Sequence, residues 1–347
     1  MIYLDRDLSK FDPLVRRGSY VPTIWRLHLR PDRLDPKDVV SYCANKDVLG
    51  LGWRLGPPEG WRLGPPEAEK ESVDVYLERH KVAYEGKSIS PVRMILKEVA
   101  KDDFIWTRDD LGRYILGKVL APGDFHYDST VELSASGSAD STWYKLKDMF
   151  HFVPVKLIGC GSGEPLSDTE VPGGVKARFA AKGGTLSRIR DDFILPYTTW
   201  LFDQKCGVLT ARPTSPRFIL ALSSFELEDL VLLYLQTLGW RIILSSHARN
   251  TPRYECTLVR SENSLARTAG VQVRHDNVVL DAEVYRDDKQ GDIVYLFAAS
   301  GNYGNDRPEN VRIIKENDLM EFAETNRCLL PKPISIWLGP SNNSGLQ

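Results

Sequence analysis

Acidic, amide and basic side chains between residues 226 and 274 are spaced as a divalent metal site would require. Glu255 interrupts a largely apolar segment, Gln272 and Arg274 stand two positions apart in another, and Glu226 lies near the start of a predicted helix. Residues two apart on a strand share one face. Carboxylate and amide oxygens suit Mg²⁺, which polarises phosphoryl oxygens and activates water. We therefore expect Glu226, Glu255 and Gln272 to bind Mg²⁺ and Arg274 to lie beside a phosphate.

The elements that must position these residues follow an α/β order. Residues 225–237 have helical spacing and end before Gly239, a helix-terminating signal. Beyond this helix we predict strands at 240–245, 253–260 and 270–275, a short apolar segment at 278–285, strands at 293–299 and 311–314, and a helix at 316–325. This order indicates a central sheet covered on both faces.

This segment resembles a known nuclease family. The resemblance rests on Phe225-Glu226, Gly239-Trp240, Tyr254-Glu255-Cys256, Val271-Gln272-Val273-Arg274 and residues 293–301. These motifs are similar to the Mrr-type branch of the PD-(D/E)XK restriction endonucleases, over about residues 223–324. The resemblance implies a restriction-endonuclease-like α/β domain that hydrolyses DNA with Mg²⁺ through Glu226, Glu255 and Gln272. Arg274 departs from the family, which has lysine there, and a guanidinium is bulkier and always protonated, so the departure puts catalysis in question.

The first 211 residues show mostly β-type patterning and hold six of the eight tryptophans. We predict strands at 23–30, 48–53, 104–108, 113–119 and 150–158, with helices at 35–44, 72–84 and 91–101. The strands at 104–108 and 113–119 are separated by Asp-Asp-Leu-Gly, which indicates a β-hairpin.

Part of this region resembles the barrel-forming segments of PUA-like domains, the superfamily that contains the EVE and SRA modified-base readers. The resemblance rests on residues 104–108, 114–119 and 171–175. It implies a pocket that holds a flipped base on aromatic rings. The candidate base-binding residues are Trp53, Trp106 and Tyr114, with Arg26, His28 and Arg30 as a basic stripe for phosphates. Alternatively, the rings fill the core of a barrel, and the stripe is a solvated strand face.

Charge and composition limit the range of functions. The 347 residues include 45 Lys and Arg against 47 Asp and Glu, a net charge of -2, so nucleic acid would have to meet a local basic patch. Apolar stretches are too short for a membrane span, and the first residues lack signal-peptide features; we expect a soluble, cytoplasmic protein. The five cysteines show no C-x-x-C spacing and are expected to be buried hydrophobes. The duplicated octamer GWRLGPPE at 52–67 is expected to be a loop.

These observations together predict an α+β protein of two domains. A β-rich, PUA-like barrel at 1–211 would sense a modified base, and a restriction-endonuclease-like domain at 217–347 would cut the double-stranded DNA, as in prokaryotic restriction or defence systems. Cutting two strands generally requires two active centres, so a homodimer is a reasonable expectation. Two alternatives stay open: an inactive nuclease fold that only binds DNA or senses modification, and an enzyme of another class built on the β-rich half, for which no Ser-His-Asp or Cys-His spacing is found.

Overall fold

The computed structural model describes most of the chain and leaves several segments outside the description. The described residues are 20–29, 36–52, 55, 71–85, 87–125, 150–160, 164–180, 184–190, 193–213, 218–246, 254–275, 279–286 and 291–338. Both GWRLGPPE copies, apart from Gly52 and Leu55, therefore lie outside it.

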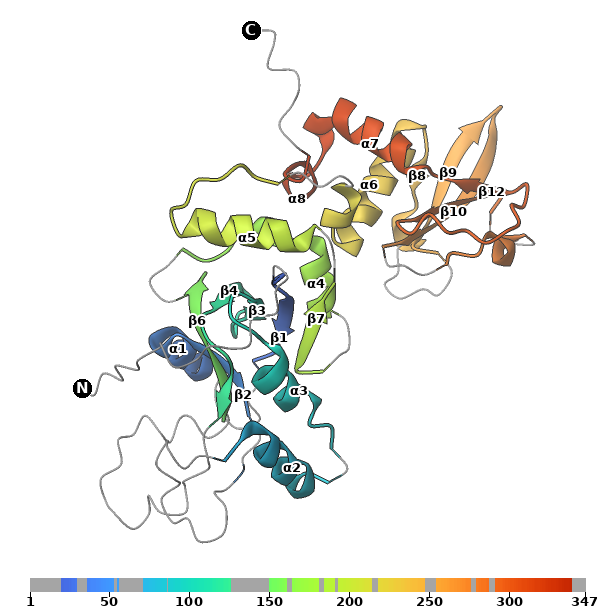
Figure 1. Cartoon of the computed structure of the whole chain (residues 1–347). Helices are drawn as coiled ribbons and strands as arrows, with labels where there is room; N and C mark the ends of the chain where they lie inside the picture. Colours follow the sequence, from blue (N-terminus) through green and yellow to red (C-terminus); the bar gives the residue numbers. More distant parts are fainter. Residues whose placement is uncertain are drawn as a thin grey trace.

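The N-terminal half is built on a seven-stranded, open and curled sheet (Figure 1). Its strands are β1 (Ile24–Leu27), β2 (Val48–Leu51), β3 (Phe104–Arg108), β4 (Tyr114–Val119), β5 (Asp124–Phe125), β6 (His151–Ile158) and β7 (Leu186–Ile189). Their order is β2-β6-β4-β3-β1-β7, with β5 also paired to β6. Only the β1–β3 pair is parallel among these described strands. The predicted hairpin is β3–β4, with Phe104 opposite Lys118.

Five helices accompany this sheet in the described part of the N-terminal half. They are α1 (Pro36–Lys46), α2 (Val73–Ala83), α3 (Ser90–Arg93), which continues as a π-helix (Met94–Glu98), α4 (Gly173–Ala180) and α5 (Ile194–Lys205). The first three match the predicted helices. Helices α4 and α5 were not predicted, and the assignment of residues 171–175 to a barrel-forming segment is wrong because α4 begins at Gly173.

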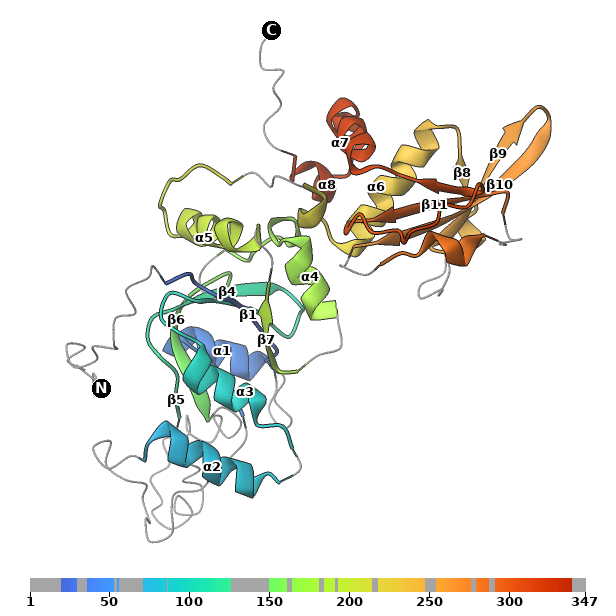
Figure 2. The same cartoon turned by 45° about the vertical axis from the view of Figure 1, so that its right-hand side comes forward.

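The C-terminal half carries a five-stranded sheet with the order β12-β11-β10-β9-β8 (Figure 2). Its strands are β8 (Arg241–Ile242), β9 (Cys256–Glu262), β10 (Leu265–Arg274), β11 (Ile293–Ala298) and β12 (Val311–Ile313). Its helices are α6 (Ser224–Thr237), α7 (Glu316–Thr325) and α8 (Lys332–Ser335). Strands β9 and β10 form an antiparallel hairpin, whereas β10, β11 and β12 run parallel. The element order agrees with the prediction, and the fold as a whole is mixed α and β.

Alternate residues of the central strands bury opposite faces of this sheet. Val271, Val273 and Phe297 join the cluster that includes the apolar side of α6, while Leu296 and Ala298 join a smaller cluster around Tyr254. Gln272 therefore points to the second face, because it alternates with the two valines.

One hydrophobic core connects the two halves. It contains β-sheet residues such as Trp106 and Leu116, residues of α4 and α5, and much of α6, α7 and the segment up to Leu338. The two sheets thus share a helical layer, visible in Figure 2 as α4, α5, α6 and α8 between them. The proposed boundary at 211–217 stays a prediction.

Two further expectations from the sequence concern membrane-spanning segments and the cysteines. No described helix has the length and apolar character that crossing a bilayer demands. All five cysteines are free; Cys43 and Cys256 are buried, Cys160 and Cys206 are half-buried, and Cys328 is exposed. The expectation of buried cysteines is thus wrong for Cys328.

Candidate functional site: an acid–amide–arginine cluster

Glu255 and Gln272 lie directly across from each other on the β9–β10 hairpin. Strand pairing places Val271 opposite Cys256, and the Glu255 amide donates to the Val271 carbonyl at 2.8 Å, so the next pair outward is Glu255 and Gln272. Side chains directly opposite on an antiparallel pair share a face and interact. Gln272 Nε2 accordingly donates to Glu255 Oε1 at 2.7 Å. The two residues that the sequence singled out therefore converge.

The buried amide of Gln272 is only half satisfied. The side chain is fully buried, Nε2 is bound to Glu255, and Oε1 has no hydrogen-bond partner in the described structure. An orphaned buried acceptor costs about 1–3 kcal/mol. Such a group between the buried Val271 and Val273 is a departure from good packing, of the kind that functional sites show.

The acid–amide pair fits a divalent cation. Rotating the amide by half a turn would place Oε1 where Nε2 stands, close to 2.7 Å from Glu255 Oε1. Neighbouring ligands of octahedral Mg²⁺ stand about 3 Å apart, and Mg²⁺ commonly takes one or two carboxylates and completes its shell with water and phosphate. Glu255 and Gln272 would hold such an ion. Among the described residues, no group of three or more His, Cys, Asp or Glu side chains is arranged to hold a metal, so these two would have to suffice.

Arg274 ends β10 beside this pair. Its Nη1 lies 3.7 Å from Glu255 Oε1, and its side chain is 38% exposed against 15% for Glu255. The Ala299 amide donates to the Arg274 carbonyl at 2.8 Å, which fixes the backbone at the carboxyl end of β10 against the end of β11. The guanidinium is thus anchored at its backbone and partly open to solvent, as a phosphate-binding group must be.

Glu228, which the sequence analysis did not single out, is an α6 carboxyl group whose pKa is influenced by the charges of this cluster. It lies on the half-buried side of α6, and α6 packs against β10. Burial, followed by the negative charges of Glu255 and Asp229, raises the pKa of Glu228 to about 7, while the charge of Arg274 lowers it. Burial and the charges of Glu255 and Glu228 also raise the pKa of the Cys256 thiol to about 12. Glu228 is therefore a carboxyl group of α6 whose pKa is affected by Glu255 and Arg274.

Glu226, the predicted helix ligand, is engaged elsewhere. Its Oε2 accepts from the Ser223 amide at 2.6 Å, its own amide donates to Ser223 Oγ at 3.3 Å, and its Oε1 accepts from Lys176 at 2.9 Å. Residues two apart on a helix point about 200° away from each other, so Glu226 faces away from Glu228. The assignment of Glu226 as a metal ligand is corrected accordingly. The Ser-x-x-Glu spacing at 223–226 is a capping-box signature, and that signal could have separated the two acids.

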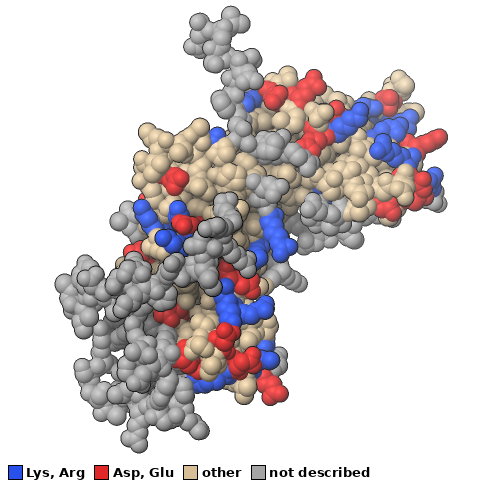
Figure 3. Space-filling view, viewed as in Figure 1, with Lys and Arg blue, Asp and Glu red and all other residues tan. Residues whose placement is uncertain are grey.

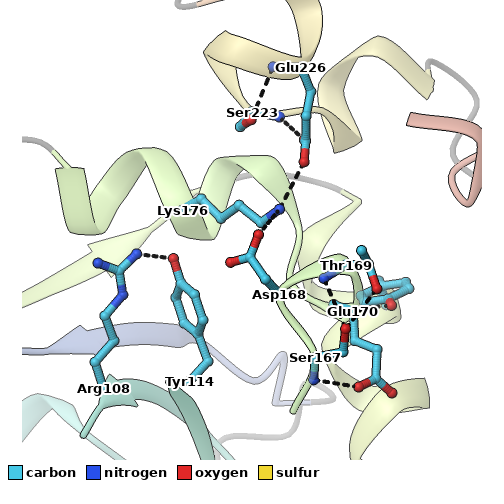
Figure 4. A network of polar contacts seen from close by, with 10 residues as sticks. Arg108, Tyr114, Ser167, Asp168, Thr169, Glu170, Lys176, Ser223 and Glu226 are labelled. Atoms are coloured by element: carbon cyan, nitrogen blue, oxygen red, sulfur yellow. Dashed lines mark hydrogen bonds and ion pairs between the residues drawn. The ribbon is translucent and has the colours of Figure 1, made fainter. Parts of the chain in front are cut away.

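Two of the three predicted base-binding rings, Trp106 and Tyr114, are core residues. Trp106 is fully buried, donates through Nε1 to Thr198 Oγ1 at 3.3 Å and meets Tyr114 edge to face. Tyr114 is 3% exposed; its hydroxyl accepts from Arg108 (Figure 4), whose guanidinium stacks over its ring at 4.3 Å. The alternative reading, in which the rings fill the core, is the one the packing supports, and Trp106 and Tyr114 do not line an open pocket.

The two described residues of the predicted basic stripe, Arg26 and His28, do not form a solvated face. Arg26 is 2% exposed and donates to the backbone carbonyls of Arg178, at 2.8 Å, and Gly184. His28 is half-buried and meets the Phe179 ring edge to face at 5.2 Å. Arg26 therefore holds β1 against α4 and β7. Arg30 and Trp53 lie outside the described residues. On the face drawn in Figure 3, blue and red side chains of the described residues are interspersed, in line with the balanced composition.

Comparison with known proteins gives little. No protein-family model matches the chain, and no curated protein matches it. Among solved structures, the chain is similar to "MspJI Restriction Endonuclease in Complex with 27-mer Oligonucleotide", with 11% identity over 83% of this chain and 70% of that one and a TM-score of 0.20. At that score the similarity carries no argument about this chain, and the functional case rests on the site.

Proposed function

We propose that the protein is a metal-dependent DNA endonuclease with a modification-dependent choice of substrate. The observation that supports this most is the convergence of Glu255 and Gln272 at 2.7 Å with Arg274 at 3.7 Å from the same carboxylate oxygen. A carboxylate, an amide oxygen and an arginine within one cluster are the groups that phosphodiester hydrolysis assisted by Mg²⁺ requires.

Each residue has a distinct role in the proposal. Glu255 and Gln272 hold Mg²⁺, which when bound polarises the phosphoryl oxygen and lowers the pKa of water. Arg274 holds the phosphate from its partly exposed position. Glu228, whose pKa is raised to about 7, can accept or release a proton near neutral pH. The duplex would lie along the open side of the hairpin, and a homodimer would supply a centre for each strand.

Burial of several predicted residues narrows the candidates for recognition of a modified base. Trp106, Tyr114 and Arg26 are buried. The predicted base- and phosphate-binding residues that remain are Trp53, Arg30 and the half-buried His28. The proposal therefore assigns base recognition to the N-terminal half as a whole and not to a particular ring.

Cleavage assays test the proposal directly. Duplexes containing 5-methylcytosine, 5-hydroxymethylcytosine or N6-methyladenine, and an unmodified duplex, are incubated with the protein in Mg²⁺ or in EDTA. We expect Mg²⁺-dependent cutting of a modified duplex. Glu255→Gln removes a charged ligand worth several kcal/mol, so its cleavage rate should fall by about a hundredfold or more. Glu262→Gln, on the exposed end of the same strand, is the matched control and should cut normally.

A second candidate function is binding without hydrolysis. The observation that favours it is the position of Arg274, whose fixed positive charge lies 3.7 Å from the oxygen that would bind the metal and competes with it. In that case the wild-type protein would bind the modified duplex, measured by fluorescence anisotropy, and cut none. Arg274→Lys is the deciding arm of the assay, because a gain of cutting would identify Arg274 as the block.

A further inference from the structure

The first turn of α6 is attached to the N-terminal half through one carboxylate. Glu226 closes the capping box with Ser223 through Oε2, while its Oε1 accepts from Lys176 of α4 at 2.9 Å (Figure 4). Lys176 also lies 3.1 Å from Asp168 Oδ2. The carboxylate that caps the start of α6 is thus also the one that binds Lys176 of α4. The start of α6 therefore cannot shift without breaking this bond.

Burial makes this ion pair a restraint. The side chains of Lys176 and Glu226 are 12% and 11% exposed, whereas that of Asp168 is 73% exposed. Burial by itself lowers the pKa of Lys176, but the hydrogen bond and charge of Glu226, together with Asp168, outweigh it and raise the pKa. Exposed pairs contribute little, while breaking a buried one leaves an uncompensated charge. The bond to Glu226 therefore matters more than the one to Asp168.

A backbone contact at the same junction supports the restraint independently. Gly173, the first residue of α4, packs so closely that a Cβ there would overlap the Leu222 carbonyl and the Ser223 nitrogen. Both of those residues immediately precede α6. Because these atoms belong to the backbone, they cannot rotate away, and the two helix starts hold a fixed separation.

Helix α6 transmits this position to the candidate site. Glu226 faces the junction, while the apolar side of α6 packs on the sheet face formed by Val271, Val273 and Phe297. The two valines belong to β10, which also carries Gln272 and Arg274. We propose that Lys176 is a positioning residue for the C-terminal site: by holding Glu226, it sets the rotation and height of α6 and hence the place of β10, the strand that carries Gln272 and Arg274. This inference rests on the proposed nuclease function, and it assigns the N-terminal half a part in catalysis beyond substrate choice.

Two measurements on the full chain test the inference separately from the function. In a Cys328→Ser background, spin labels at Leu111→Cys and Leu265→Cys, both exposed and on different sheets, report the distance between the halves by electron–electron double resonance. Lys176→Met removes the charge and keeps the stem, Lys176→Arg keeps the charge, and Asp168→Asn is the control at the exposed partner. Cleavage of the modified duplex gives kcat and KM for the same variants.

We expect Lys176→Met to broaden the distance distribution and to lower kcat by about tenfold or more with little change in KM, because misplacement of a reacting group reduces turnover. Lys176→Arg should restore both readouts, and Asp168→Asn should match the wild type. A narrow distribution in Lys176→Met, or an unchanged kcat despite a broad one, would overturn the positioning role. If the wild type cuts no duplex, the nuclease proposal fails, while the distances still decide whether Lys176 fixes the junction.

Discussion

Arg26 and Trp106 in the N-terminal half differ from Gln272 and Glu228 in the C-terminal half in how far their contacts account for them. In the N-terminal half, Arg26 donates to two backbone carbonyls and Trp106 to a threonine, so both are explained by the fold. In the C-terminal half, Gln272 keeps a buried acceptor without a donor, and Glu228 has its pKa raised to about 7. The fold does not need these last two features. Residue type alone therefore indicates a site less reliably than the absence of a structural reason for the residue.

The largest expected effect falls on the N-terminal side of this comparison. Trp106→Ala should lower the free energy of unfolding by about 3–5 kcal/mol, because it removes a fully buried ring from the shared core. Trp106→Phe keeps most of the volume and loses the bond to Thr198, which should cost about 1 kcal/mol. Urea denaturation measures both. If folded Trp106→Phe lost affinity for modified DNA but kept it for unmodified DNA, the ring would be a base reader after all.

A smaller effect, dependent on pH, is expected at Glu228. Its pKa is raised from 4.5 to about 7, so the folded protein holds this proton more tightly than the unfolded chain does. That contribution to stability is fully present below about pH 4.5 and is lost as the pH rises through about 7. Glu228→Gln cannot ionise and should be more stable than the wild type at pH 8, by about 1 kcal/mol after allowance for solvent screening.

Thermal unfolding without metal at pH 5 and pH 8 measures this difference. The advantage of Glu228→Gln should be smaller at pH 5, where wild-type Glu228 is itself protonated. An advantage of the same size at both values would show that the carboxyl group does not titrate differently in the folded state.

The smallest effect on stability is expected at Gln272. Gln272→Met removes the orphaned acceptor at similar volume and also the Nε2 bond to Glu255. These two changes oppose each other, so stability should change by no more than about 1 kcal/mol while Mg²⁺-dependent cutting is lost. Gln236→Met, exposed on α6, is the matched control and should affect neither. A stability loss above about 2 kcal/mol would place Gln272 with the structural residues of the N-terminal half.

Much of the fold could be predicted wherever local signals agree with packing. Helix α6 begins with a capping box and ends before Gly239, which has a positive φ of 87°, and β11 is a continuous apolar run. Helices α4 and α5 gave no such signal. Helix α4 opens on two glycines, which are poor helix formers, and α5 is largely apolar and buried, so it lacks the polar face that reveals an amphipathic helix. Tertiary contacts stabilise both.

The hairpin shows a second limit of local signals. Strand β10 begins at Leu265, five residues before the predicted strand at 270–275. The turn that allows this consists of Asn263 and Ser264, both with positive φ, 50° and 63°, which suits a two-residue hairpin loop. Asn-Ser lacks the glycine that usually marks such a turn, so the sequence did not indicate it.

The candidate site was predicted in part for a related reason. Glu255 and Gln272 follow from strand alternation, which depends only on residue spacing. The choice between Glu226 and Glu228 depends on which side of α6 meets β10 and which meets Lys176, and that contact joins residues fifty positions apart. The spacing of acids within one helix cannot encode it.

The continuous core, whose residues range from Ile24 to Leu338, limits how the two halves of the protein can be separated or recombined. Separating the chain near residue 212 into two fragments would expose the apolar residues that α5 and α6 contribute to this core. Each fragment would then carry an exposed apolar surface that favours aggregation. Grafting the C-terminal sheet onto a different N-terminal half would thus require redesign of the shared helical layer.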